Sequence, residues 1–485
     1  MKVKNLVISI TSACFLLLMA CQSSEKELEK PNILFIAVDD LRPEMNCFGA
    51  SYIHSPNLDQ LAKEGMIFTE AHCNIPVCGA SRASLLTGTR PTRFRYLDYP
   101  TRAEDDYPGV LSLPKHFKDK GYHTISNGKI FHHRNDLADS WNEIWAPTPS
   151  LAPGDYFLPE NVALANREGL RGPAYEHADV PDSVYRDGKL ALKAISDLRK
   201  LKEMDQPFFL ACGFMKPHLP FNAPSRYWDL YERSSIHLPE NRYAPENAPP
   251  EAQHQFGELR KYWDIPREGQ VSDSLARTLI HGYYACVSYV DQMIGMVLDE
   301  LKALDLDKNT IVILWGDHGY NLLEHGLWNK QCNYRTSLRS VLMLKVPGET
   351  NGAKCEAMVE FVDIYPTLCE LAGLELPEHL EGLSLAPLVN DPGMEWKDFV
   401  ISKWFDGLTI KTREYAYTEW SKSDSAIYAR MLYDHQNDLG ENYNISESEA
   451  LQTVIDELSN TMKEHRGKDF NTPIPGGKTR EHLMF

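Results

Sequence analysis

Four short apolar runs in the chain have the length and composition of buried parallel strands. They cover residues 32–38, 122–126, 207–213 and 310–315. Apolar runs without a regular polar alternation are typical of strands that are covered on both faces. Between the runs lie segments with helical periodicity, at 55–63, 113–120, 183–201, 274–304 and 363–372. Strands that alternate with helices predict a doubly wound α/β sheet.

Each apolar run is followed by polar side chains that can take part in chemistry. In chain order these are Asp39 and Asp40, then Lys129 and His132, then Lys216 and His218, and finally Asp317 and His318. Ligands of open α/β sheets bind outside the carboxyl ends of the strands. We therefore expect one site to which four separate strands contribute.

Three stretches depart from this alternation. Residues 141–182 and 219–270 are rich in Pro, Asn and aromatic residues without clear periodicity, which predicts long surface excursions that shape a pocket. After about residue 385, short alternating runs at 398–404, 408–411 and 415–420 predict a small antiparallel sheet, followed by a terminal helix at 446–465. We place the boundary after residue 388, between a catalytic domain of residues 31–388 and a C-terminal α+β subdomain of residues 389–485.

The N-terminus has the pattern of an export signal. Lys2 and Lys4 precede an apolar stretch at 6–19, and Ala20-Cys21 is followed by a polar segment. This resembles a bacterial lipoprotein signal, with a signal peptide at 1–20, a lipidated Cys21 and a tether at 21–30. A plain signal peptide or a short membrane anchor is the alternative, although a spanning helix needs about 20 apolar residues. We expect an exported lipoprotein, periplasmic or anchored to the outer membrane, that meets the membrane only through this lipid.

Composition restricts the partners. The 485 residues are 43% hydrophobic and 24% charged, which is ordinary for a globular protein. Fifty basic residues against 68 acidic ones give a formal net charge of −18, which disfavours nucleic-acid binding. An anionic ligand must therefore be held by a local cluster of cations. The ten cysteines show no CxxC pair or disulfide-dense spacing.

Asp39-Asp40 and Asp317-His318 are two halves of a candidate metal site. Carboxylate oxygens are the ligands that Ca²⁺ and Mg²⁺ prefer. Two adjacent aspartates face one ion only if the backbone turns between them, which a strand end permits. His318 departs from an all-oxygen set, so the sequence predicts a divalent metal more firmly than it predicts which one.

Residues 77–90 carry the most specific motif of the chain, VCGASRASLLTGTR. It resembles the sulfatase motif, in which C-x-P/A-S-R is followed by L-x-T-G, with Ala80 as an accepted variant of the more common proline. In that family a maturase converts the cysteine, here Cys78, to formylglycine, whose hydrated aldehyde attacks sulfur. A helix that starts just after Cys78 would direct unpaired N–H groups and partial positive charge at an oxyanion.

The resemblance to type I sulfatases of the alkaline phosphatase superfamily extends from about residue 31 to residue 440. It includes SPNLDQLA at 55–62, GYHT at 121–124, GDHG at 316–319 and EHGLWNK at 324–330. Within the family the chain is most similar to the iduronate-2-sulfatase group, through GKIFH at 128–132 and MKPHLPF at 215–221. Tyr320 and Gln331 depart from that group near the expected pocket, which leaves the sugar open. The implied fold is alkaline phosphatase-like: a large mixed sheet flanked by helices, with a smaller C-terminal subdomain.

The resemblance also implies a role for each site residue. A divalent cation, Ca²⁺, is expected on Asp39, Asp40, Asp317, His318 and the group derived from Cys78. Asp317 is a candidate base for the attacking hydroxyl, while Arg82 and Lys129 stabilise the modified residue and the sulfate. His132 takes the proton that allows sulfate to leave, and His218 and Lys330 assist the leaving oxygen. The substrate contacts implied are Lys129, His218, Tyr320 and Lys330.

The expected activity is sulfate-ester hydrolysis on a sulfated glycan, exo-acting, with uronate 2-O-sulfate of glycosaminoglycan-type oligosaccharides as the leading bond. Another sulfated polysaccharide, algal or fucose-containing, is an alternative. A second alternative is a phosphonate or phosphodiester hydrolase of the same superfamily. A catalytically inactive glycan-binding lipoprotein would lack the nucleophile or ligands, whereas every core position is present.

Overall fold

The computed structural model describes residues 30–147, 154–167, 169, 171–255, 257–423 and 426–471. The expected signal peptide, Cys21 and nearly all of the tether lie outside these residues. Within them, no helix combines the length and the apolar character needed to cross a membrane. The lipoprotein prediction therefore stays a prediction from the sequence.

The centre of the molecule is a mixed sheet with a parallel middle. Strand β1 (Asn32–Val38) lies between β8 (Thr310–Gly316) and β6 (Phe208–Phe214), and β3 (His123–Gly128) and β4 (Glu143–Trp145) continue beyond β6, all in parallel. On the β8 side follow β12 (Leu342–Lys345), β2 (Met66–His72) and β11 (Arg339–Ser340), with β13 (Ala353–Glu360) also beside β2. Strand β12 runs antiparallel to both of its neighbours, β8 and β2. The α/β sheet predicted from the four apolar runs is confirmed, since they form β1, β3, β6 and β8.

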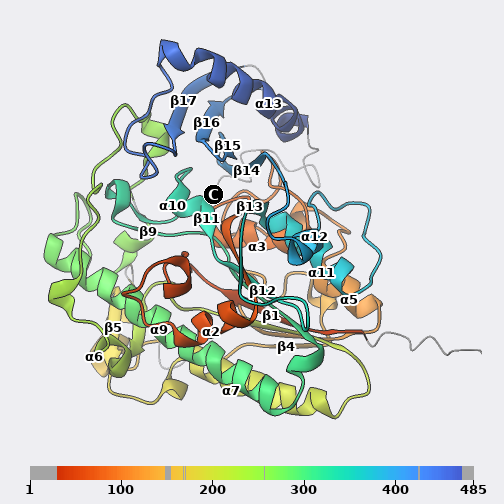
Figure 1. Ribbon diagram of the computed structural model, residues 1–485. Helices are drawn as coiled ribbons and strands as arrows, with labels where there is room; N and C mark the ends of the chain where they lie inside the picture. The colour runs from red at the N-terminus through yellow and green to blue at the C-terminus, as the bar shows by residue number, and fades with distance from the viewer. Residues whose placement is uncertain are drawn as a thin grey trace, which may run out of the picture.

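Helices cover both faces of the sheet. Leu34, Ile36 and Val38 of β1 pack with α2 (Pro56–Glu64), α7 (Arg186–Lys202) and α9 (Asp273–Ala303). Ile33 and its alternate neighbours in β1 pack with α3 (Cys78–Thr87), α5 (Leu113–Asp119), α11 (Ile364–Leu371) and α12 (Ala386–Asn390) on the other face. In Figure 1, α7 lies below strand β1 of the central sheet, and α3, α11 and α12 lie above it. Burial on both faces explains why these strands are apolar without alternation.

The register of the parallel strands aligns their carboxyl ends. Val38 pairs with Phe214 on one side and with Gly316 on the other, and Gly128 pairs with Gly213. The residues that follow these four strands therefore leave the sheet at the same level. This is why polar residues from four distant stretches of the chain meet at one edge.

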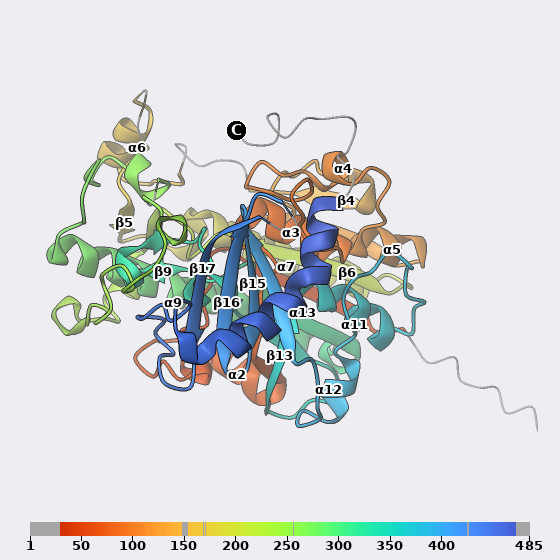
Figure 2. The same cartoon turned by 90° about the horizontal axis from the view of Figure 1, so that it is seen from above.

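The C-terminal part forms a second, smaller sheet. Strands β14 (Phe399–Trp404), β15 (Gly407–Thr412), β16 (Tyr415–Ser421) and β17 (Ile427–Asp434) are antiparallel in sequence order, and α13 (Gln452–Asn471) crosses them (Figure 2). The first three strands match the predicted runs, whereas β17 was not predicted and the helix starts six residues later than expected. The predicted boundary after residue 388 falls inside α12, whose Leu388 and Val389 pack in the main core.

Short elements fill the remaining excursions. They are β5 (Tyr175–Ala178) paired with β7 (Phe221–Pro224), β9 (Asn321–Leu322) paired with β10 (Trp328–Asn329), and the helices α4 (Ala103–Asp106), α6 (Pro159–Ala165), α8 (Ser225–Trp228) and α10 (Arg335–Leu338).

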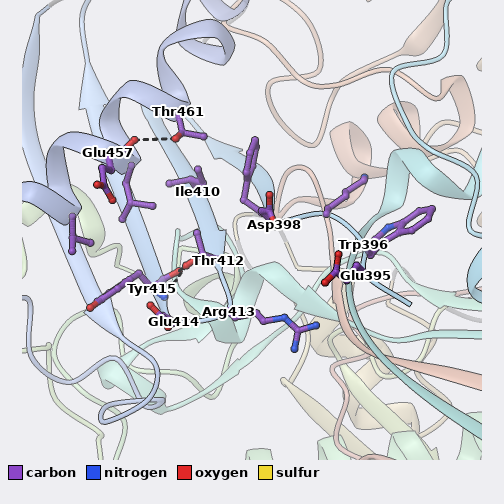
Figure 3. Close-up of a pocket in the computed structure, with 14 residues that line it drawn as sticks. Glu395, Trp396, Asp398, Ile410, Thr412, Arg413, Glu414, Tyr415, Glu457 and Thr461 are labelled. Carbon is purple, nitrogen blue, oxygen red and sulfur yellow. Dashed lines mark hydrogen bonds between the residues drawn. The ribbon is translucent and has the colours of Figure 1, made fainter. Parts of the chain in front are cut away.

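A hollow of about 840 Å³ lies in the C-terminal part, between α13, strands β14 to β16 and the segment that precedes β14. Figure 3 shows its lining, which includes Trp396, Arg413, Tyr415 and Thr461. None of the polar residues that follow the four central strands lines it. This hollow is therefore separate from the site predicted at the strand ends.

Two leucines of α7 test how the layers are held together. Leu198 is fully buried against the sheet, whereas Leu192 on the same helix is 48% exposed. We expect Leu198→Ala to lower the free energy of unfolding by about 2–5 kcal/mol, because it removes buried methyl groups and leaves a cavity. Leu192→Ala, the matched control, should change it by less than about 0.5 kcal/mol. Equal effects in urea unfolding would contradict the layered packing.

Candidate active site at the strand ends

A backbone turn lets both aspartates after β1 face the same space. Asp40 adopts a left-handed conformation, with φ of 61°. Its backbone N–H donates to Oδ1 of Asp317 at 3.0 Å, so the ends of β1 and β8 are joined directly. Both aspartates and Asp317 are fully buried. The turn that the adjacent carboxylates require is therefore present.

Helix α3 brings Cys78 to these carboxylates. Cys78 is the first residue of the helix, and all ten residues of α3 are buried. Its Sγ lies 3.3 Å from Nε2 of His318 and 3.8 Å from Oδ1 of Asp40. Burial and the nearby Asp39 raise the pKa of the Cys78 thiol well above its usual value. The unmodified thiol is thus a poor nucleophile in this position.

Arg82, one turn further along α3, connects the ends of three strands, β1, β3 and β8. Its Nε donates to Asp317 Oδ2 at 2.9 Å and one terminal nitrogen donates to Asp39 Oδ1 at 3.0 Å. The other terminal nitrogen donates to the carbonyls of Lys129 and Ile130 after β3. The guanidinium is fully buried, so these charge-assisted hydrogen bonds replace the water that would otherwise solvate its charge.

Two lysines complete the pairing of the carboxylates. Lys129 Nζ donates to Asp39 Oδ2 at 2.6 Å, and Lys330 Nζ donates to both oxygens of Asp40 at 2.9 and 3.0 Å. Burial alone would raise the pKa of Asp39, yet Lys129 and Arg82 hold it well below its usual value. Burial likewise opposes the charge of Lys330, but Asp40 raises the pKa of its ammonium well above the usual value.

The donor set at the strand ends fits a divalent cation. Ligand atoms of Asp39, Asp40, Cys78 and His218 lie within 4.8 Å of one another, and so do those of Cys78, Asp317 and His318. Burial and the negative charge of Asp39 raise the pKa of Asp317 above its usual value, although His318 lowers it. A cation bound among the carboxylates would relieve this repulsion. The two groups together offer three carboxylates, which hard cations prefer, with two imidazoles and the sulfur of Cys78.

The two predicted histidines lie in different electrostatic surroundings. Burial and the charge of Lys129 lower the pKa of His132 to about 2, and its Nδ1 is buried without a hydrogen-bond partner among the described residues. His218 is bonded through Nδ1 to the carbonyl oxygen of Leu219 at 2.6 Å. Burial disfavours its charge, but Asp40 raises the pKa of His218. His132 is therefore a neutral imidazole with an unpaired Nδ1, whereas His218 is the histidine whose surroundings favour the protonated form.

A cavity of about 500 Å³ opens onto these groups. Its wall includes the predicted residues Cys78, Lys129, His132, His218 and Lys330, together with Gln331. The two aperiodic excursions contribute to it as predicted, through Arg171, Gly257, Glu258 and Lys261.

Tyr320 is the one predicted substrate contact that does not line the cavity. It is fully buried, donates its hydroxyl to Asn329 at 3.0 Å, and lies under the ammonium of Lys330 at 6.0 Å. Its ring also stacks on Tyr283. Tyr320 therefore supports Lys330 from behind, and the sequence pattern could not distinguish this position from the cavity wall.

Glu258 is a site residue that the sequence did not reveal. Its carboxylate lies 3.2 Å from Nε2 of His218 and 3.0 Å from Nζ of Lys330. It follows no predicted strand and belongs to no recognised motif, so nothing marks it among the 68 acidic residues. The only available signal was its place in the 219–270 excursion.

Comparison with known proteins agrees with this geometry. A family model described as Sulfatase matches residues 31–374, and one described as N-sulphoglucosamine sulphohydrolase, C-terminal, matches residues 323–468. Iduronate 2-sulfatase of Mus musculus is 34% identical over 408 residues, which cover 76% of this chain and 73% of that protein.

Two solved structures share the fold at low identity. One is a protein in complex with its substrate D-glucosamine-2-N,6-O-disulfate, at a TM-score of 0.75 and 20% identity, covering 93% of this chain and all 100% of that one. The other is a phosphonate monoester hydrolase from Silicibacter pomeroyi, at a TM-score of 0.73 and 20% identity, covering 91% of this chain and 96% of that one.

The Sulfatase model spans most of the sheet and its layers, and the identity to a curated sulfatase extends over three quarters of the chain. The predicted alkaline phosphatase-like fold is confirmed by the mixed nine-stranded sheet, the small antiparallel sheet and the structural neighbours. The chain belongs to the sulfatase family: it is a type I sulfatase of the alkaline phosphatase superfamily, an enzyme that hydrolyses sulfate esters.

Proposed function

We propose that the enzyme is a formylglycine-dependent sulfatase that removes the 2-O-sulfate from a terminal uronate of glycosaminoglycan-type oligosaccharides. The observation that carries this is the position of Cys78, at the start of a buried helix and within 4 Å of His318 and Asp40. The 34% identity to an iduronate 2-sulfatase supports the uronate ester. Lys129, His218 and Lys330 in the cavity wall suit an anionic substrate in a protein of net charge −18.

The proposed cofactors are one divalent cation, Ca²⁺, and formylglycine at position 78. Asp39, Asp40, Asp317 and His318 would hold the cation, which supplies Lewis-acid polarisation of a sulfate oxygen. Formylglycine supplies a hydrated aldehyde in place of the weakly nucleophilic thiol. Arg82 and Lys129 hold the modified side chain and the sulfate through charge-assisted hydrogen bonds.

Proton transfers fall to three side chains of this site. Asp317, whose pKa is raised, is placed to accept the proton of the attacking hydroxyl. We assign to His132 the second proton, whose removal lets the sulfate depart, because its imidazole is neutral and its Nδ1 has no hydrogen-bond partner among the described residues. His218 and Lys330 stabilise the leaving oxygen of the sugar with donated hydrogen bonds. A hydrated aldehyde at position 78 would bond to sulfur as the sugar oxygen leaves, and would then release sulfate as the aldehyde forms again, which splits one difficult displacement into two easier steps.

A phosphonate or phosphodiester hydrolase is the second candidate, because the fold is shared with a phosphonate monoester hydrolase at a TM-score of 0.73. That likeness is one of fold, at 20% identity. The identity of 34% to an iduronate 2-sulfatase favours the sulfate ester.

From the N-terminal sequence pattern we also propose that Cys21 is lipidated and that the enzyme is exported. An exported enzyme would meet a polymer that is found outside the cell.

The substrate proposal is tested with disaccharides that carry a single sulfate at uronate O2 or at glucosamine N, O3 or O6. We expect sulfate release, measured by ion chromatography, to be fastest from a terminal uronate O2 and absent from an internal one. Cys78→Ala is the control and should release none, because it lacks the nucleophile. Release from a glucosamine position alone would contradict the uronate assignment.

Conversion of Cys78 is tested by the mass of the tryptic peptide that ends at Arg82. In protein produced with a formylglycine-generating maturase, we expect this peptide to be about 18 Da lighter than the thiol form. Protein produced without the maturase should retain the thiol and lack activity. Full activity in protein that carries only the Cys78 thiol would contradict the proposed nucleophile.

The proposed role of His132 requires a neutral imidazole. Burial and Lys129 lower the pKa of His132 to about 2. We therefore expect its ring ¹⁵N chemical shifts to remain those of a neutral imidazole at pH 5. The signals that disappear in His132→Gln identify this residue in the spectrum. The pKa of His132 is lower in the folded state than the value of about 6.5 in the unfolded state. As the pH falls below about 6.5, the unfolded state therefore binds a proton that the folded state does not, and the free energy of unfolding decreases. A titration of His132 near pH 6.5 would refute this electrostatic account.

A further inference from the structure

Glu258 is a carboxylate in the wall of a site that must bind an anion. Its side chain is 20% exposed, and its two oxygens lie 3.2 Å from His218 Nε2 and 3.0 Å from Lys330 Nζ. A terminal nitrogen of Arg171 is 3.7 Å from the first oxygen. Burial would raise the pKa of Glu258, yet Lys330 and His218 hold it well below its usual value, so the carboxylate is ionised.

An ionised carboxylate restricts which part of the substrate can meet it. It repels the sulfate oxygens and any sugar carboxylate, because like charges at contact distance are unfavourable. A carboxylate accepts about four hydrogen bonds, of which His218 and Lys330 use two. The favourable substrate group is therefore a donor, and on a sugar the common donor is a hydroxyl.

The position of Glu258 selects which hydroxyl this is. In the proposed function, His218 and Lys330 contact the ester oxygen that becomes the leaving group. Glu258 is one hydrogen-bond length from each of them, on the cavity side. Because Glu258 shares one cluster with His218 and Lys330, a substrate group next to the bound ester oxygen would face Glu258, and on a sugar that group is the oxygen on the neighbouring carbon.

We propose that Glu258 is a specificity and positioning residue, which holds His218 and Lys330 together and accepts a hydrogen bond from the hydroxyl adjacent to the sulfate ester. The substrate class is thus a sugar with a sulfate and a free hydroxyl on neighbouring carbons. This rests on the proposed function, because it assigns the leaving oxygen to His218 and Lys330. For a uronate 2-O-sulfate the hydroxyl is the one at C3.

The test crosses a change in the enzyme with a change in the substrate. The substrates are the methyl glycoside of 2-O-sulfated iduronate, its 3-deoxy analogue, and 4-nitrophenyl sulfate, which has no adjacent hydroxyl. With the wild-type enzyme, we expect deoxygenation to lower kcat/KM on the order of 10²-fold, because the charged acceptor loses the hydrogen bond that the substrate hydroxyl donates. With Glu258→Ala, the two glycosides should react at rates within about threefold of each other, the range of ordinary context effects.

The kinetics of 4-nitrophenyl sulfate hydrolysis test the positioning role of Glu258 separately from its hydrogen bond to the substrate. Glu258→Ala should lower kcat by about tenfold with a smaller change in KM, because the groups at the leaving oxygen lose their common partner. Glu258→Gln keeps the size and one acceptor and should recover part of both effects. Glu251→Gln is the matched control, since Glu251 is an exposed carboxylate of the same excursion outside the cavity, and it should behave as wild type.

The outcomes separate this inference from the proposed function. If wild type and Glu258→Ala, at equal melting temperatures, suffer the same loss from deoxygenation, Glu258 does not bind that hydroxyl and the inference fails while the sulfatase assignment stands. If the wild-type enzyme hydrolyses 4-nitrophenyl sulfate but neither glycoside, the uronate assignment fails and the inference fails with it. A loss confined to the enzyme that retains Glu258 supports the inference.

Discussion

The architecture of the site depends on keeping three like-charged aspartates buried together at the ends of two adjacent strands. Asp39, Asp40 and Asp317 are fully buried, and such an arrangement is unfavourable unless each charge is paired. Arg82 contributes one buried guanidinium that bonds to two of them at once. Helix α3 must therefore be buried along its whole length, and that same placement sets Cys78 at its first turn against the carboxylates.

The net charge of −18 describes the whole chain and not the site. Around the cavity, Arg82, Lys129 and Lys330 each pair with a buried aspartate, and His218 stands beside Lys330. A bound divalent cation would take over part of the pairing with the aspartates, and the side-chain cations would then be available to an anionic ester. The surface charge and the affinity for an anion are thus compatible.

Much of this could be predicted from the sequence because it depends on local pattern. The apolar runs that form β1, β3, β6 and β8 are buried on both faces, so hydropathy alone identifies them. Because these strands are parallel, the residues that follow them lie at one edge of the sheet. Glu258 and Tyr320 show where such prediction ends. Glu258 reaches the site through an irregular excursion, and Tyr320 lies behind the ammonium of Lys330 and outside the cavity wall. Both positions depend on tertiary packing that no periodicity encodes.

The most direct test of the strand-end cluster as a divalent-cation site is the melting temperature of EDTA-treated enzyme with and without CaCl₂, measured for wild type and Asp317→Asn. A ligand at 100 times its dissociation constant stabilises the folded state by about 2.7 kcal/mol. We expect a clear rise in the wild-type melting temperature, little rise in Asp317→Asn, and sulfate release that returns with calcium. An identical rise in both proteins, or full sulfate release in EDTA, would contradict a metal-assisted sulfatase centre built on Asp39, Asp40, Asp317 and His318.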